Sequence, residues 1–239
     1  MCSLRRQGNI FVLTLTGAGE HRLNPTLIDA IKSSLLRVRA ALPPPSVLIT
    51  TAHGKFFSNG YDLAWSKSPD PVESDARGRL MVAKFKALVA DFLSLPMPTI
   101  AAVNGHASAA GFVLALSHDY VLMRKDRGFL YMSELDIGLV IPRWFTAVIR
   151  CKIGSAAARR DVLLRSKKVT AEEAVAEGIV FSAHDGAEET LRAAVRLGEE
   201  LEGRRWDGHV YGEIRMGLYS EIPEAIRLDG EMSGTASRL

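Results

Sequence analysis

The chain has little of three things that would place it in a specialised class: cysteine, long apolar runs and charge of one sign. Only Cys2 and Cys151 occur among the 239 residues, which argues against a disulfide framework or a cysteine metal site and suits a reducing compartment. The longest apolar runs, such as 100–103 and 112–116, fall far short of the roughly 20 residues that cross a bilayer. We therefore expect a soluble protein that needs no membrane.

Charge and histidine patterns exclude several partners. The net charge is +3, but the basic residues are scattered and no aromatic side chains interleave with them, so no nucleic-acid partner is expected. The mild excess suits the steering of a small anionic ligand. No Walker A motif or spaced dinucleotide fingerprint occurs, and no metal-ligand spacing links the histidines, which are His21, His53, His106, His118, His184 and His209. We expect neither a metal nor a separate cofactor.

Apolar periodicity predicts strands that alternate with helices at first, followed by helices alone. The expected strands cover 9–16, 47–51, 119–123 and 128–132, with a further strand at the start of 98–116. The expected helices cover 25–42, 74–95, 155–165, 171–177 and 187–201, and the prolines at 43–45 end the first of them. The strand at 9–16 has no small-residue cleavage site after it, so it is not a signal peptide and secretion is not expected. This order indicates an α/β core, residues 1–200, with a helical extension and a flexible tail over 201–239.

The segment Pro98 to Leu116, PTIAAVNGHASAAGFVLAL, is typical of a turn that exposes backbone amides. Small side chains from Gly105 to Gly111 let a ligand approach the main chain, and the first N–H groups of the following helix have no internal acceptor. Such amides bind an anion or a developing oxyanion. Tight packing of a helix on a strand would explain the small residues equally well.

A second turn of this kind lies in the loop 53–70, within the sequence FFSNGYDL. A Ser-Asn-Gly turn before a helix that starts at Asp62 and Leu63 would place the Tyr61 N–H at the helix N-terminus, facing outward. Asn-Gly is a common turn dipeptide, so this loop alone is weak evidence. Two such turns are more specific, because they can hold one carbonyl oxygen between two N–H donors.

A third candidate is Glu134, which interrupts a largely apolar run over 131–142 together with Asp136. A carboxylate among Met, Leu, Ile and Val side chains would be desolvated, which would raise its pKa and suit it to proton transfer near neutral pH. A solvated or salt-bridged Glu134 is the alternative. Ser108 lacks the G-x-S-x-G spacing of a hydrolase nucleophile.

The motifs FFSNGYDL, PTIAAVNGHASAAG with LALSHDY, and SELDIGLVIP resemble, in their order and spacing, the enoyl-CoA hydratase/isomerase (crotonase) family over residues 8–200. The resemblance implies a crotonase-like spiral of ββα units, an acyl-CoA substrate, and C-terminal helices that help to build a homotrimer or hexamer. It implies that the N–H groups of Tyr61 and Ala110 form an oxyanion hole for the thioester carbonyl. The implied substrate-binding residues are Ser58, Asn59, Gly60, Tyr61, Asp62, Leu63, Ala110 and Gly111.

Within that family, the position of Val113 separates two reactions. Hydratases of the family carry a glutamate there and a second one at the position of Glu134, because the addition of water requires control of both the nucleophile and a proton. Glu134, Gly138, Pro142 and Trp144 follow the spacing E-x-x-x-G-x-x-x-P-x-W, which resembles the Δ3,Δ2-enoyl-CoA isomerases and, over the whole chain, their plant peroxisomal members. Glu134 is then the implied catalytic base.

Two features depart from the family pattern: Ala109 and Ala110 replace the commoner Gly-Gly, and Tyr61 is bulky. Neither removes a backbone N–H, so they bear on chain-length preference more than on mechanism. Possible contacts to the acyl or pantetheine part are Phe56, Phe57, Trp65 and Trp144, all of which are also ordinary core residues.

The expected function is isomerisation of cis- or trans-3-enoyl-CoA to trans-2-enoyl-CoA in the β-oxidation of unsaturated fatty acids. Another crotonase-type reaction, hydration or thioester hydrolysis, and a non-catalytic acyl-CoA-binding paralogue are the alternatives. The last residues, Ser237-Arg238-Leu239, resemble the Ser-Lys-Leu signal, which indicates a peroxisomal location and an import receptor as a partner.

Overall fold

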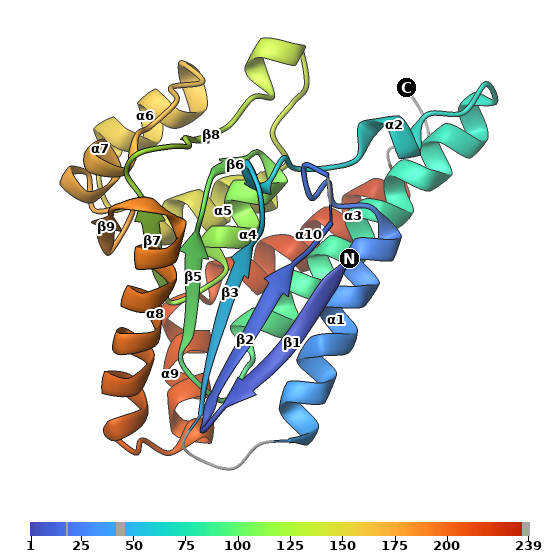
Figure 1. The fold of residues 1–239 in the computed structure, drawn as a ribbon. Coiled ribbons are helices and arrows are strands. Elements are labelled where there is room, and N and C mark those ends of the chain that lie inside the picture. Colours follow the sequence, from blue (N-terminus) through green and yellow to red (C-terminus); the bar gives the residue numbers. More distant parts are fainter. Residues whose placement is uncertain (18, 42–45, 236–239) are drawn as a thin grey trace.

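The computed structural model describes residues 1–17, 19–41 and 46–235 (Figure 1). Its larger sheet has six strands in the order β1-β2-β3-β5-β7-β9, in which β1 is antiparallel to β2 and the other neighbours are parallel. These strands are β1 (Cys2–Gln7), β2 (Ile10–Leu15), β3 (Val47–Ala52), β5 (Thr99–Val103), β7 (Tyr120–Arg124) and β9 (Ser182–His184).

A second, parallel sheet contains three short strands in the order β4-β6-β8. These are β4 (Phe56–Ser58), β6 (His106–Ser108) and β8 (Leu130–Tyr131). Each follows a strand of the larger sheet, namely β3, β5 or β7, and each precedes one or more helices. This repetition is the expected spiral of ββα units, and the α/β fold class is confirmed.

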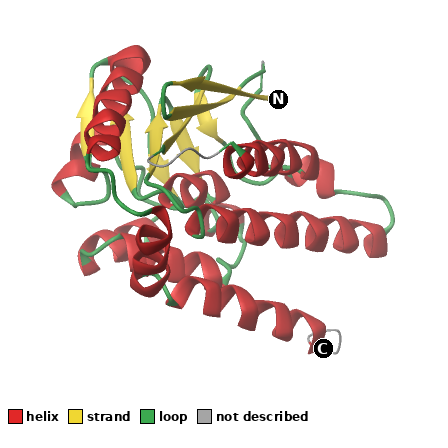
Figure 2. Ribbon diagram, turned by 90° about the horizontal axis from the view of Figure 1, so that it is seen from below, coloured by secondary structure: helices red, strands yellow, loops and turns green. Residues whose placement is uncertain are grey.

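Helices cover both faces of the larger sheet (Figures 1 and 2). On one face α8 packs on β3, β5 and β7, where alternate strand residues such as Ile49 and Ile100 meet Ala194. The opposite face builds the main core beneath α1 and α3. The helices are α1 (Pro25–Ala40), α2 (Leu63–Ser66), α3 (Pro71–Leu93), α4 (Ala110–Leu116), α5 (Arg143–Lys152), α6 (Ala156–Leu164), α7 (Ala171–Ala176), α8 (Gly186–Gly203), α9 (Gly208–Leu218) and α10 (Glu221–Thr235).

The structure corrects the expected start of the fold. The strand predicted at 9–16 is the second strand, because β1 precedes it and pairs with it in antiparallel register from Cys2–Leu15 to Gln7–Ile10. The sequence did not predict β1, because Arg5 and Arg6 interrupt its apolar pattern, as charged side chains do on an exposed edge strand. The loop predicted over 53–70 also contains β4, and the helix expected to start at Asp62 and Leu63 is α2.

The predicted helices in the first half agree with α1 and α3, and those at 155–165, 171–177 and 187–201 agree with α6, α7 and α8. The elements α5 and β9 were not predicted, whereas α9 and α10 lie in the helical extension that was expected over 201–239 without individual bounds. The prolines at 43–45 and the tail residues 237–239 lie outside the described residues. Within the described part of the chain, no helix is long and apolar enough to cross a membrane, and both cysteines are free.

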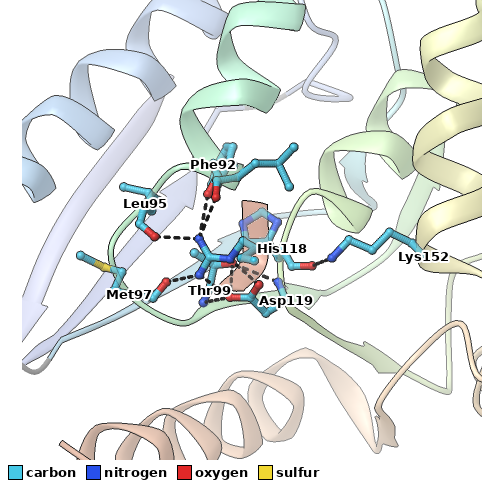
Figure 3. Close-up of polar contacts among 9 residues, drawn as sticks. Phe92, Leu95, Met97, Thr99, His118, Asp119 and Lys152 are labelled. Atoms are coloured by element: carbon cyan, nitrogen blue, oxygen red, sulfur yellow. Dashed lines mark hydrogen bonds and ion pairs between the residues drawn. The ribbon is translucent and has the colours of Figure 1, made fainter. Parts of the chain in front are cut away.

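A buried arginine attaches α9 to the rest of the fold. Arg215 is 3% exposed and forms two hydrogen bonds with the carboxylate of Asp119, both 2.7 Å long. It also donates to backbone carbonyls where α3 ends and β5 approaches, which are those of Phe92, Leu93, Leu95 and Met97 (Figure 3). The five N–H donors of the guanidinium group serve these six acceptor atoms, so the two hydrogens of Nη1 are shared among three carbonyls. The C-terminal helices are therefore fixed against the N-terminal edge of the sheet.

Candidate active site

The small sheet gathers the three motifs that the sequence singled out. Strands β4, β6 and β8 are parallel neighbours, so their carboxyl ends meet at one edge. Asn59, Ala109 and Glu134 follow these three ends in turn. Segments that are more than 20 residues apart in sequence therefore become neighbours.

The first two turns are in direct contact through their glycines. A Cβ added to Gly60 would lie 3.5 Å from the Ala110 nitrogen and 3.0 Å from the Ser108 carbonyl oxygen. A Cβ added to Gly111 would lie 2.1 Å from the Ser58 carbonyl oxygen, which is far inside van der Waals contact. Only glycine permits this approach, and it brings the residues before Tyr61 against the N-terminus of α4.

The direction of the Tyr61 N–H follows from a hydrogen bond on the other side of its peptide unit. Leu23 N donates to Gly60 O at 2.7 Å. The Gly60 carbonyl and the Tyr61 N–H belong to one planar trans peptide unit and point in opposite directions. The Tyr61 N–H therefore points away from Leu23, and among the described residues no backbone acceptor receives it.

The second turn is held in a conformation that is unusual for its sequence. Ala109, the residue before α4, has φ 51° and ψ −122°, a backbone region that favours glycine. Its N–H donates to Tyr131 O at 2.9 Å, which ties the turn to β8. Ala110 follows as the first residue of α4, and within the described structure its N–H has no backbone acceptor. Within the described residues, neither predicted donor amide therefore has a backbone acceptor, and the turns that carry them are in contact.

Glu134 lies at the end of the third segment and is 7% exposed. Burial raises the pKa of its carboxyl group, although hydrogen bonds from its own backbone and from Ser133 oppose the shift. Its Oε2 atom is buried and has no hydrogen-bond partner, and no ion pair forms with it among the described side chains. Of the two sequence-based alternatives, the desolvated carboxylate is confirmed and the solvated or salt-bridged one is wrong.

The remaining predicted site residues hold the first turn in place. Ser58 Oγ donates to His21 O at 2.7 Å, and Asn59 Nδ2 donates to Glu20 Oε2 at 2.7 Å. Asp62 caps α2 by accepting from Trp65 N at 3.0 Å. Leu63 begins that helix and is exposed, whereas Val113 is fully buried in α4. The side chains of Ser58, Asn59 and Asp62 therefore shape the turn and are occupied by protein partners.

Aromatic side chains form the wall beside Tyr61. Its ring lies edge-on to Phe85 at 5.5 Å and stacks on Phe145 at 6.0 Å, and Trp144 packs on both of those phenylalanines. The Tyr61 hydroxyl is buried without a partner, and burial raises its pKa. Phe57 and Trp144 are fully buried core residues. Sequence reasoning missed Phe85 and Phe145, because only the packing of α3 and α5 places them here.

A large apolar hollow lies elsewhere. Its volume is about 570 Å³, and its lining includes Asp119 and Tyr120 at the N-terminal end of β7 together with exposed side chains of α9. Figure 1 shows α9 at the end of the fold away from β6 and β8, so this hollow lies opposite the segment that carries Glu134. Among the described residues no cluster of His, Cys, Asp and Glu could hold a metal ion.

Comparison with solved structures defines the fold class. The chain is similar to an enoyl-CoA isomerase of Mycobacterium tuberculosis, with a TM-score of 0.86 and 21% identity over 100% of this chain and 98% of that one. It is also similar to an enoyl-CoA hydratase of Mycobacterium marinum, with a TM-score of 0.84 and 21% identity over 95% of both chains. The architecture is the crotonase fold.

The sequence narrows this class to a family. The family described as "Enoyl-CoA hydratase/isomerase" matches residues 5–206, and this protein belongs to it. Peroxisomal enoyl-CoA delta isomerase 1 of Arabidopsis thaliana is 60% identical over 93% of this chain and 91% of its own length. Peroxisomal enoyl-CoA delta isomerase 2 of the same plant is 54% identical over 98% of this chain and 99% of its own length. Enoyl-CoA delta isomerase 3 of that plant, whose name gives no location, is 53% identical over 95% of this chain and 96% of its own length.

Proposed function

We propose that the protein is a Δ3,Δ2-enoyl-CoA isomerase that converts cis- or trans-3-enoyl-CoA to trans-2-enoyl-CoA in the β-oxidation of unsaturated fatty acids. The observation that carries the proposal is that three groups follow neighbouring strands of the small sheet: the buried Glu134 carboxylate, whose Oε2 has no hydrogen-bond partner, and the Tyr61 and Ala110 amides, which have no backbone acceptor among the described residues. The names of the three Arabidopsis relatives support the same reaction.

The reaction needs one base and one oxyanion site. Glu134 removes a proton from C2 of the substrate, and the electron pair of that C–H bond forms a dienolate whose oxygen accepts hydrogen bonds from the Tyr61 and Ala110 amides. The protonated Glu134 then returns the proton to C4, so the double bond moves and nothing is consumed. CoA enters as part of the substrate, and these steps require no metal or redox cofactor. Ser58 to Leu63 and Gly111 would line the thioester end.

The raised pKa of Glu134 suits this exchange. A base whose proton affinity is increased by burial abstracts the weakly acidic C2 proton more readily than an ordinary carboxylate. Val113, at the position where hydratases of the family carry a second glutamate, supplies no carboxylate to position water. These two facts favour isomerisation over hydration.

A Glu134→Gln variant tests the proposal. It keeps the volume of the side chain and removes the base, so we expect a loss of at least about a hundredfold in kcat for 3-hexenoyl-CoA. Asp136→Asn is the matched control, because Asp136 is an exposed carboxylate two residues further on, and we expect its activity to be unchanged. Retention of most activity by Glu134→Gln would reject the mechanism.

Product analysis separates the alternatives. Hydration of 2-enoyl-CoA would give a 3-hydroxyacyl product, thioester hydrolysis would release free CoA, and a non-catalytic acyl-CoA-binding paralogue would bind the ester without turnover. We expect the 2-enoyl product from 3-enoyl-CoA with neither of the other products. Because the hydratase and thioesterase reactions would also use the oxyanion hole, only the product decides between them.

The location and assembly belong to the same proposal. The tail residues 237–239, together with the names of two relatives, support import into peroxisomes through a receptor, and removal of these three residues should leave a fluorescent fusion in the cytosol. A homotrimer or hexamer is supported by a stripe on α9 where Val210, Ile214 and Leu218 are 53%, 67% and 68% exposed. An Ile214→Glu variant should lower the mass measured by light scattering.

A further inference from the structure

We infer that the hydrogen bond between Asn24 and Asp62 positions the Tyr61 amide that the proposed isomerisation uses. Asn24 Nδ2 donates to Asp62 Oδ2 at 3.0 Å across 38 residues of sequence. Asp62 directly follows Tyr61 in the chain. The inference rests on the proposed function, because a misplaced amide changes the rate only if it binds the substrate oxygen.

Each partner also caps a helix with its second polar atom. Asn24 Oδ1 accepts from Leu27 N at 3.0 Å at the start of α1, and Asp62 Oδ1 accepts from Trp65 N at 3.0 Å at the start of α2. Each side chain is therefore held by hydrogen bonds at both of its terminal polar atoms. The pair couples the first turns of two helices and leaves Asp62 little freedom to move.

The backbone beside this pair sets the direction of the Tyr61 N–H. Leu23 N donates to Gly60 O at 2.7 Å, and Leu23 O accepts from Asp62 N at 3.2 Å. Leu23 thus contacts the residue on each side of Tyr61. Since Asn24 is joined to Leu23, its bond to Asp62 keeps the two segments in register at the point where the amide must be oriented.

The turn needs such external support because Gly60 lies within it. Gly60 has φ +72°, and glycine crosses between backbone regions at little cost, so the Gly60–Tyr61 peptide could rotate. On its N-terminal side the turn is held by Asn59, which donates from its backbone N to Glu20 O at 2.9 Å and from its side chain to the Glu20 carboxylate. On the C-terminal side, the corresponding side-chain contact is the one from Asn24 to Asp62.

A reciprocal exchange of the two side chains tests this role. Asn24→Asp alone places two carboxylates against each other, and Asp62→Asn alone places two amide NH₂ groups against each other unless a cap is given up. The double exchange, Asn24→Asp with Asp62→Asn, restores the bond in the reverse direction and retains both caps. We expect each single variant to lose about tenfold to a hundredfold in kcat with KM within about twofold, and the double variant to recover to within about threefold.

Two further measurements separate positioning from folding. Asp62→Ser keeps a capping oxygen for Trp65 N but cannot reach Asn24, so it should show the same kcat loss even if the other single variants unfold. The ¹⁵N chemical shift of the Tyr61 amide should move in the single variants and return in the double variant. This shift does not depend on turnover.

The outcomes are distinct. Single variants with the kcat and the Tyr61 shift of the wild type would overturn the inference, as would a folded double variant without recovery of either. If the wild-type protein did not isomerise 3-enoyl-CoA, the proposed function would fail. The Tyr61 shift would then still decide whether the pair positions the amide.

Discussion

Gly111 and Ser58 lie in such close contact that a single methyl group between them would collide with the backbone. A Cβ on Gly111 would be 2.1 Å from the Ser58 carbonyl oxygen and 2.7 Å from its carbonyl carbon. This contact joins the helix that carries Ala110 to the strand that leads into Tyr61. The spacing of the two candidate donor amides therefore depends on the absence of a side chain.

A Gly111→Ala variant should accordingly lose both stability and activity. Displacement of β4 from α4 should cost about 1–3 kcal/mol in the free energy of unfolding and lower kcat for 3-enoyl-CoA at least about tenfold. Urea unfolding and a steady-state assay measure the two effects. Gly217→Ala is the control, because a Cβ on Gly217 within α9 meets nothing within 4 Å. A Gly111→Ala variant as active as that control would contradict the packing argument.

An Ala109→Gly variant should be more stable than the wild type. The positive φ of 51° strains an alanine, and relief of this strain outweighs the extra entropy of glycine in the unfolded chain by about 1 kcal/mol. Thermal unfolding measures the difference, and we expect the isomerase activity to be retained. Ala107→Gly, in the neighbouring strand β6, should instead lower the stability. Equal losses in both variants would show that Ala109 is not strained.

The pH profile of isomerisation should reflect the burial of Glu134. The base must be ionised, and desolvation raises its pKa above the ordinary value of 4.5. The plot of kcat/KM should therefore rise with pH through a midpoint above 4.5 and remain level once the carboxyl group is ionised. The Asp136→Asn variant should show the same midpoint. A midpoint at or below 4.5 would disagree with a desolvated base.

Loss of Arg215 should destabilise the protein strongly. An Arg215→Met change leaves the largely buried carboxylate of Asp119 without its cation, which we expect to cost about 3–5 kcal/mol in unfolding free energy. Arg79→Ala, which breaks the exposed pair with Asp75, should leave the stability almost unchanged. Chemical denaturation compares the two. If both variants lost little unfolding free energy, the attachment of α9 would not depend on Arg215.

The free energy of unfolding should also decrease as the pH is lowered, because of His118. Its Nδ1 lies 3.0 Å from Leu114 O, which can only accept, so Nδ1 carries the proton and Nε2 accepts from the Thr50 hydroxyl at 2.8 Å. Burial lowers the pKa of His118 from 6.5 to about 4. Between these values the unfolded chain binds a proton that the folded protein does not, so the stability present above pH 6.5 is lost by up to about 3 kcal/mol as the pH falls towards 4.

A His118→Gln variant checks this assignment. Its unfolding free energy should change less than that of the wild type between pH 6.5 and pH 4.5, measured by urea titration. His209→Gln, at an exposed position of α9, should keep the dependence of the wild type. If the His118→Gln variant kept the full pH dependence of the wild type, groups other than His118 would be responsible for that dependence.

The sequence by itself determined the units of this fold and the segments that carry its chemistry. Buried strands such as Val47–Ala52 and Thr99–Val103 show in the sequence as apolar runs, and amphipathic helices such as α3 repeat with the period of their buried face. The turns at Tyr61 and Ala110 and the carboxylate at Glu134 were found from residue type and spacing alone. Edge strand β1 was not found, because its exposed charged residues break the apolar alternation, and the helices α9 and α10 were expected only as a helical extension without bounds.

Only the tertiary structure decided how these segments meet. Nothing local indicates that β4, β6 and β8 are neighbours, that Gly111 lies against Ser58, or that Asn24 reaches Asp62 38 residues away. The helix predicted from residue 25 gives no sign that the side chain of Asn24, just before it, holds a second segment. The burial of Glu134 was equally open, since desolvation depends on neighbours from distant parts of the chain. Local preference selects strands, turns and helices, whereas the contacts that orient two amides and desolvate one carboxylate arise only when the chain packs upon itself.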